Sequence, residues 1–134
     1  SQNFNKALYW SWSSQLTGEK KAKNIIKESQ KSLTKDEIDN TREAVKNFLE
    51  DRIFNRDYEA ILPLARWYIY IAKDQDINNA YIWYSVAAAM NQQTASIYRN
   101  KLMKEIKSDE INNLQIEAQN IYQKIISVKN EEME

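Results

Sequence analysis

Few residues in this chain are of types that could carry out chemistry. The sequence of 134 residues contains no His and no Cys. It therefore has no imidazole that titrates near neutral pH, no thiolate nucleophile and no zinc site of the usual ligand types. The single Gly and single Pro also exclude a glycine-rich phosphate-binding loop. A catalytic site would have to use carboxylates, lysines, tyrosines or serines.

The same pair of adjacent carboxylates occurs twice in the sequence, as Asp36-Glu37 and as Asp109-Glu110. Adjacent residues at the start of a helix point to different faces, and their charges complement the helix dipole. Helix capping therefore accounts for both pairs. The serines of residues 11–14 have no His to activate them, and nothing further supports a dyad with Lys6. We therefore predict that the chain is not an enzyme and has no cofactor or metal site.

Hydrophobic periodicity predicts helices along almost the whole chain. Thr34 and Glu37 fit a capping box, Asp57 is a candidate cap, and Pro63 should kink its helix or move its start to a later residue. The expected helices cover residues 5–16, 22–33, 35–53, 57–72, 80–88, 95–106 and 108–125. Seven helices joined by short links predict an all-α array.

The chain also contains an internal repeat with an offset of 73 residues. This offset aligns, without a gap, Asn5 with Asn78, Ala7 with Ala80, Trp10 with Trp83, Ala22 with Ala95, and residues 36–38 with 109–111. We interpret the chain as one domain, 1–134, with a first three-helix module at 5–53, a connecting helix at 57–72 and a second three-helix module at 78–129.

Several of these residues carry a family resemblance. They are Ala60, Leu64, Ala65, Tyr68, Ala80, Trp83, Tyr84, Ala87, Ala88 and Ala95, with Ala7, Trp10 and Ala22 in the looser first copy. In this pattern the chain resembles the Sel-one-like repeat, a relative of the tetratricopeptide repeat. The resemblance implies a right-handed α-α superhelix, a solenoid of about seven antiparallel helices, in which these residues are packing positions. The first copy lacks a helix before residue 5, so either an upstream helix was removed or that face packs elsewhere.

A solenoid of this kind implies a surface that binds other proteins, because stacked helix pairs leave a continuous concave face. Trp67, Tyr70 and Tyr81 lie off the main apolar stripes, and Trp12 could cover the place of a missing neighbour. These four residues are the candidate partner-binding residues. An exposed face formed by Leu8, Trp12 and Leu16 would also predict a homodimer through the N-terminal helix.

Two functions remain open at this point. The first is a non-catalytic adaptor or scaffold that binds a protein or peptide on the concave face of the array. The second is an inhibitor or immunity-type protein that neutralises a cognate bacterial toxin or effector enzyme. The sequence does not identify the partner protein.

Charge gives further expectations about partners and compartment. Nineteen basic residues balance nineteen acidic ones, so we expect no nucleic-acid partner. Residues 1–56 hold eleven basic and eight acidic side chains, and residues 57–134 hold eight and eleven. The lysine stripe Lys20, Lys23, Lys27 and Lys31 is interpreted as a solvated helix face. No apolar run is long enough to span a bilayer, so we expect no membrane insertion. A start at Ser1 without Met favours a periplasmic or secreted protein over a cytoplasmic one.

Overall fold

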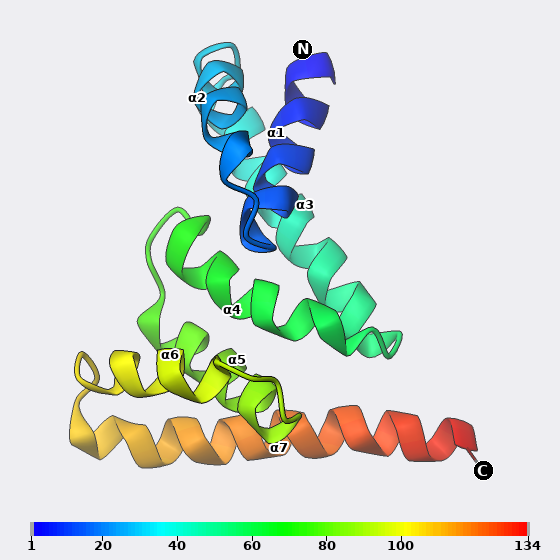
Figure 1. Cartoon of the computed structure of the whole chain (residues 1–134), viewed down its shortest axis with the longest axis vertical. Coiled ribbons are helices and arrows are strands. Elements are labelled where there is room, and N and C mark those ends of the chain that lie inside the picture. Colours follow the sequence, from blue (N-terminus) through cyan, green and yellow to red (C-terminus); the bar gives the residue numbers. More distant parts are fainter. Residues whose placement is uncertain (1, 134) are drawn as a thin grey trace.

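The chain is all-α and contains seven helices, as predicted, with no strand among residues 2–133. The computed structural model describes the backbone of residues 2–133 and the side chains of residues 3–127. Two short 3-10 helices, η1 and η2, interrupt the order. The elements are α1 (Gln2–Leu16), η1 (Lys20–Ala22), α2 (Lys23–Lys31), α3 (Lys35–Phe54), η2 (Tyr58–Ala60), α4 (Ile61–Tyr70), α5 (Ile77–Ala89), α6 (Ala95–Met103) and α7 (Ser108–Met133) (Figure 1).

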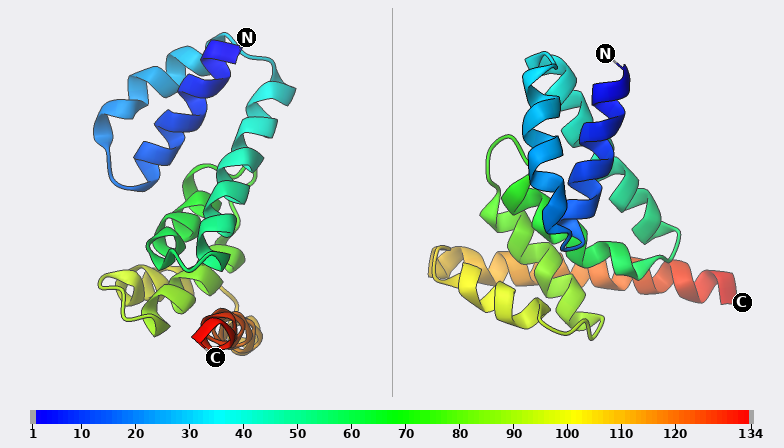
Figure 2. Two further views of the ribbon diagram at one scale, coloured as in Figure 1. Left: turned by 90° about the vertical axis from the view of Figure 1, so that its right-hand side faces the viewer. Right: turned by 45° about the horizontal axis from the view of Figure 1, so that its top comes forward.

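Two helix boundaries recur at the same offset of 73 residues as the sequence. α1 ends at Leu16 and α5 at Ala89, while α3 begins at Lys35 and α7 at Ser108. The packing recurs too, because α1 contacts both α2 and α3, and α5 contacts both α6 and α7. Figure 2 shows α1 between α2 and α3. We use the names first module for α1–α3 and second module for α5–α7.

The turns that end α1 and α5 have the same hydrogen bonds. Gly18 and Asn91 both have positive φ, +99° and +61°, and each follows the end of its helix. In the first turn the N–H of Glu19 donates to the carbonyl of Ser14 at 3.1 Å, and in the second the N–H of Gln92 donates to that of Ala87 at 3.0 Å. Such bonds satisfy carbonyls that a helix end leaves free, and Gly and Asn adopt this backbone conformation most readily. Asn91 therefore takes the role of Gly18 in the second module.

α4 connects the modules and is shorter than the predicted helix at 57–72. Pro63 lies in the first turn of α4, where its missing N–H would have no partner within the helix. This confirms that Pro63 moves the start of the helix to a later residue. The capping role predicted for Asp57 is wrong: its side chain caps no helix and instead accepts a hydrogen bond from Arg52 Nε at 2.8 Å. The α5 cap is Asp76, whose carboxylate accepts the N–H of Asn79 at 3.0 Å.

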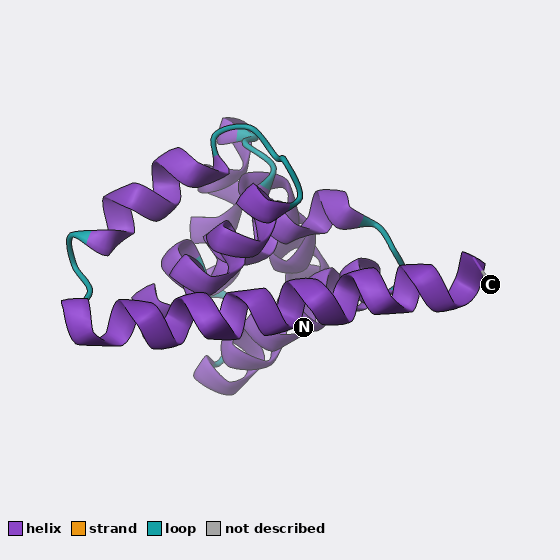
Figure 3. Ribbon diagram, turned by 90° about the horizontal axis from the view of Figure 1, so that it is seen from below, coloured by secondary structure: helices purple, strands orange, loops and turns teal. Residues whose placement is uncertain are grey.

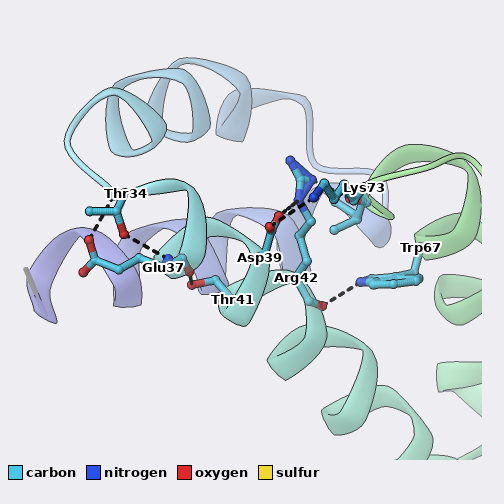
Figure 4. A network of polar contacts seen from close by, with 8 residues as sticks. Thr34, Glu37, Asp39, Thr41, Arg42, Trp67 and Lys73 are labelled. Carbon is cyan, nitrogen blue, oxygen red and sulfur yellow. Dashed lines mark hydrogen bonds and ion pairs between the residues drawn. The ribbon is translucent and has the colours of Figure 1, made fainter.

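Polar contacts fix α4 against α3 (Figure 4). Trp67 Nε1 donates to the carbonyl oxygen of Arg42 at 2.9 Å, and Arg42 Nη1 donates to the carbonyl oxygen of Ile71, just past the end of α4, at 2.9 Å. Asp39 lies 3.7 Å from both Arg42 Nε and Lys73 Nζ. A guanidinium at a helix C-terminus satisfies a free carbonyl and complements the dipole. Arg42 therefore holds the first module to the connecting helix.

The central helix of the second half is α5, which contacts α4, α6 and α7. Because neighbours cover it on several sides, seven of its thirteen residues are buried. α7 runs along the base of the molecule and extends past the other helices at its C-terminal end (Figures 1 and 3). α5 is thus the most enclosed helix, whereas α1 has neighbours on fewer sides.

Candidate functional site

Three of the four predicted partner-binding aromatics are buried. Trp12, Trp67 and Tyr81 are only 3%, 4% and 1% exposed, so the prediction that they form a binding surface is wrong. Each is held by a polar contact: the Arg42 guanidinium carbon lies 5.2 Å from the centre of the Trp12 ring, Trp67 donates to α3, and the Tyr81 hydroxyl accepts from Gln115 at 3.3 Å. Tyr70 alone of the four is exposed, at 66%.

The expected exposed face of the N-terminal helix is also buried. Leu8 and Leu16 are 0% and 1% exposed, and with Trp12 they belong to the main hydrophobic core. This face therefore cannot form the homodimer contact predicted from it. The error has a physical cause, because α3 and α4 pack against this side of α1 and leave the opposite side open.

The packing role predicted for Trp10 is wrong. It is 61% exposed, while Trp83, its counterpart in the repeat, is 8% exposed. The other predicted packing residues are buried or partly buried, as such a role requires: Ala22, Ala60, Leu64, Ala65, Ala80, Trp83, Tyr84, Ala87 and Ala95 are buried, and Ala7, Tyr68 and Ala88 are partly buried. The two tryptophans occupy equivalent helix positions in different surroundings.

Helix α4 accounts for the burial around Trp83, because it packs along α5. Trp83 lies close to the Tyr68 hydroxyl of α4 and slightly lowers its pKa. Burial, together with the nearby carboxylates of Glu50 and Asp76, raises the pKa of Tyr68 to about 12, so the hydroxyl stays protonated at neutral pH. A helix thus covers the tryptophan face of α5, whereas the tryptophan face of α1 is open.

A groove follows the open face of α1, between α1 and α3. Its lining residues are Asn5, Lys6, Tyr9, Trp10, Glu37, Asn40, Thr41 and Ala44, and its volume is about 550 Å³. We call it the α1–α3 groove. Grooves with apolar walls and a few polar groups are typical of binding sites.

Two aromatic side chains, Tyr9 and Trp10, line this groove, and Phe48 lies beside it. Tyr9 packs edge to face against Trp10, with ring centres 5.2 Å apart, and against Phe48 of α3, with ring centres 6.1 Å apart. Phe48 is 40% exposed, and the Arg52 guanidinium carbon lies 5.7 Å from its ring centre. Burial raises the pKa of Tyr9 above its usual value of 10. Trp10, Tyr9 and Phe48 thus form an exposed aromatic row across two helices.

The polar end of the groove contains one group that lacks a partner. Asn5 Nδ2 donates to Glu37 Oε2 at 3.4 Å, whereas Asn5 Oδ1 is buried and has no hydrogen-bond partner among the described residues. A buried oxygen without a partner raises the free energy of the unbound protein. Because this oxygen is closed to solvent, a ligand's N–H or O–H donor would reach it only after the Asn5 side chain turns toward the groove.

The sequence contained part of the signal for this site. The 73-residue offset aligns Trp10 with Trp83, and among the described residues no helix stands before α1 as α4 stands before α5. Together these facts predict an uncovered face on α1, but they do not show which stripe is uncovered. Tyr9 and Phe48 were not identified, because their closeness depends on how α1 crosses α3.

Other kinds of site find no support in the described part of the chain. No group of three or more His, Cys, Asp or Glu side chains there could hold a metal ion. None of the helices searched is both long and apolar enough to cross a bilayer. Comparison with known proteins found no matching family model, curated protein or solved structure.

Proposed function

We propose that this chain is a non-catalytic protein-interaction module, an adaptor or scaffold, that binds a helix of another protein in the α1–α3 groove. One observation carries the proposal: Trp10 is 61% exposed, whereas Trp83 is 8% exposed at the equivalent position, where α4 lies over it. Exposed tryptophans beside grooves are the usual anchors of protein interfaces. The partner helix would take on α1 the place that α4 takes on α5.

The helical-repeat interpretation supports the same proposal. In it, the two modules are successive units of a right-handed superhelix that resembles Sel-one-like repeats, and α4 is the helix that joins them. The recurrence of helix boundaries and of the turns at Gly18 and Asn91 agrees with this arrangement. In a solenoid each unit buries its open face against the next one, so a unit whose face is open can be covered by another helix.

The groove also determines the chemistry of the partner helix. Trp10, Tyr9 and Phe48 require an apolar stripe with side chains at spacings of three and four residues. A donor at the end of that stripe, such as a Lys, Arg, Ser or Gln side chain, would meet Asn5 Oδ1 once the Asn5 side chain turns toward the groove. We therefore expect an amphipathic helix with one polar donor beside its apolar face.

The test is recovery of a partner from the native host by the wild-type chain and by charge variants. Trp10→Glu and Phe48→Glu should abolish recovery of the dominant partner, because the first places a charge in the groove and the second places one on the ring that packs against Tyr9 beside it. Ile97→Glu is the matched control, since Ile97 is 55% exposed on α6 and lies outside the groove. Melting temperatures of the three variants should stay close to that of the wild type.

The outcomes separate the alternatives. Loss with the two groove variants and retention with the control would support the proposal, and equal recovery by all variants would overturn it. Sedimentation of the purified chain provides a second test. A homodimer that dissociates in the Trp10→Glu variant would show that the groove takes a second copy and no other protein, and would overturn the proposal as stated.

A further inference from the structure

A second hollow lies between the two modules and contains residues from both. It has a volume of about 380 Å³ and is lined by Lys20 and Lys23 of the first module, Arg66 and Tyr70 of α4, and Tyr98 of the second module. We call it the inter-module cleft. None of these residues lines the α1–α3 groove, so the cleft is a separate surface.

The cleft carries an excess of positive charge. Lys20, Lys23 and Arg66 contribute three cations, and Glu19 is the carboxylate among the lining residues. Glu19 accepts the backbone N–H of Lys21 at 3.3 Å, as the cap of η1. None of the three cations forms an ion pair with another described residue. The cleft therefore has charges that the fold itself does not neutralise.

The position of Arg66 is fixed. Its Nη1 donates to the carbonyl oxygen of Leu16, the last residue of α1, at 2.9 Å. The guanidinium also lies beside the Tyr84 hydroxyl, where it partly opposes the burial that raises the pKa of Tyr84 to about 12. Arginine has five N–H donors in a rigid fork. One side of the guanidinium is thus anchored, and donors remain that can meet an anion in the cleft.

Tyrosine rings form the rest of the cleft. Tyr98 stacks on Tyr84 with ring centres 5.6 Å apart, and Tyr70 is 66% exposed at the end of α4. A ring that is held on one face presents its other face at little entropic cost. The cleft can therefore contact an apolar or aromatic side chain as well as acidic ones.

We propose that the inter-module cleft binds an acidic segment of a protein, with its carboxylates at Lys20, Lys23 and Arg66 and an aromatic or apolar side chain on Tyr70. The charge of the cleft favours carboxylates, and the exposed tyrosine favours a peptide over a simple anion. The proposal gives a role to Lys20 and Lys23, the part of the lysine stripe that lines the cleft. Lys27 and Lys31 lie outside it.

The test is fluorescence anisotropy with a fluorescein-labelled peptide in which Glu and Tyr alternate, titrated with the full chain. We expect saturable binding that weakens with added salt, since exposed charges are screened. The Lys20→Glu/Lys23→Glu variant should bind at least about tenfold more weakly. Lys27→Glu/Lys31→Glu is the matched control, because it makes the same change of charge on α2, outside the cleft.

The outcomes are distinct. Weak binding by the cleft variant and near wild-type binding by the control would support the cleft. An equal loss of affinity in both variants would show that the peptide responds only to the overall positive charge of this region, and would overturn the proposal. Equal binding of a peptide with Gln in place of Glu, or tighter binding of a single-stranded DNA oligonucleotide, would also overturn it. Tyr70→Ser should lower affinity for the Glu–Tyr peptide and leave circular dichroism unchanged, whereas unchanged affinity would overturn the contact with Tyr70.

Discussion

The first and second modules have the same order of helices and differ in what covers them. α5 is enclosed by α4, α6 and α7, whereas α1 contacts α2 and α3 along its length and α4 more sparsely. As a result Trp83 lies in the core and Trp10 lies on the surface. Equivalent positions in a repeat therefore share a backbone role, while their burial depends on the neighbouring unit.

The modules also differ in the side chains at two further equivalent positions. Trp12 and Arg42 pack together in the first module, and the offset aligns them with Ser85 and Gln115 in the second. α1 thus buries one tryptophan on the side that faces α3 and α4 and leaves the other open. Four predictions test this comparison, in order of decreasing effect.

Trp83→Ala should lower the free energy of unfolding by about 3–5 kcal/mol, because it removes a large side chain from the core. Trp10→Ala should change it by no more than about 0.5 kcal/mol, because Trp10 is mostly exposed. Urea unfolding followed by circular dichroism measures both. Similar losses in the two variants would contradict the difference between the modules.

Arg42→Met should cost about 1.5–3 kcal/mol, because it removes a charged donor from the carbonyl of Ile71 and leaves that carbonyl without its partner. Gln115→Ala, at the equivalent position, should cost less than about 1 kcal/mol, since its contact with Tyr81 is 3.3 Å long and the residue is exposed. Urea unfolding followed by circular dichroism measures both variants. A larger loss of unfolding free energy for Gln115→Ala than for Arg42→Met would contradict the prediction.

Thr34→Ala should cost about 1 kcal/mol, the usual effect of removing an N-cap hydroxyl. The Thr34 hydroxyl accepts the N–H of Glu37 at 3.1 Å at the start of α3. The offset aligns Thr34 with Lys107, which has no side-chain acceptor to offer α7, so Lys107→Ala should be close to neutral. Thermal unfolding of both variants checks the contrast, and equal shifts in melting temperature would refute it.

The smallest effect concerns pH. The backbone N–H of Thr34 donates to Glu37 at 2.9 Å and, with the Thr34 hydroxyl, is a main cause of the lowering of the pKa of Glu37 from its usual 4.5 to about 2. A carboxyl with a lowered pKa stabilises the folded state fully above its unfolded value, and the contribution is lost as pH falls through the folded value.

The stability gap between the wild type and Glu37→Gln should therefore be constant above about pH 5.5 and shrink between about pH 4.5 and 2. Denaturant unfolding at several pH values measures it. Glu117→Gln, at an exposed position of α7, is the control and should show no such narrowing. A gap that stays constant down to pH 2 would contradict a capping role for the carboxylate.

Local interactions made much of the fold predictable. The periodicity of apolar residues, the Thr34 capping box and the effect of Pro63 all depend on residues within a few positions of one another. The count of seven helices therefore came from the sequence, as did the offset at which the helix boundaries recur. Asp57 shows the limit of such rules, because Arg52 binds its carboxylate in place of the backbone.

The candidate site was less predictable, for a reason that Trp10 and Trp12 make plain. Both lie on α1, two positions apart, and each belongs to a stripe with apolar or small residues at helical spacing. Periodicity shows that α1 has two such stripes, but it does not show which one meets α3 and α4. The structure places Trp12 inside and Trp10 outside, which reverses both predictions.

The amino-acid pattern alone was enough to predict the helices, the repeat and the absence of His and Cys chemistry. Which aromatic residues are exposed and which are buried depends on tertiary packing, which also brings Tyr9 to Phe48 and Lys20 to Arg66. The physical reason is that helix formation depends on local contacts, whereas burial depends on neighbours far away in the chain. Whether a helix residue is exposed therefore depends on which other helices pack beside it.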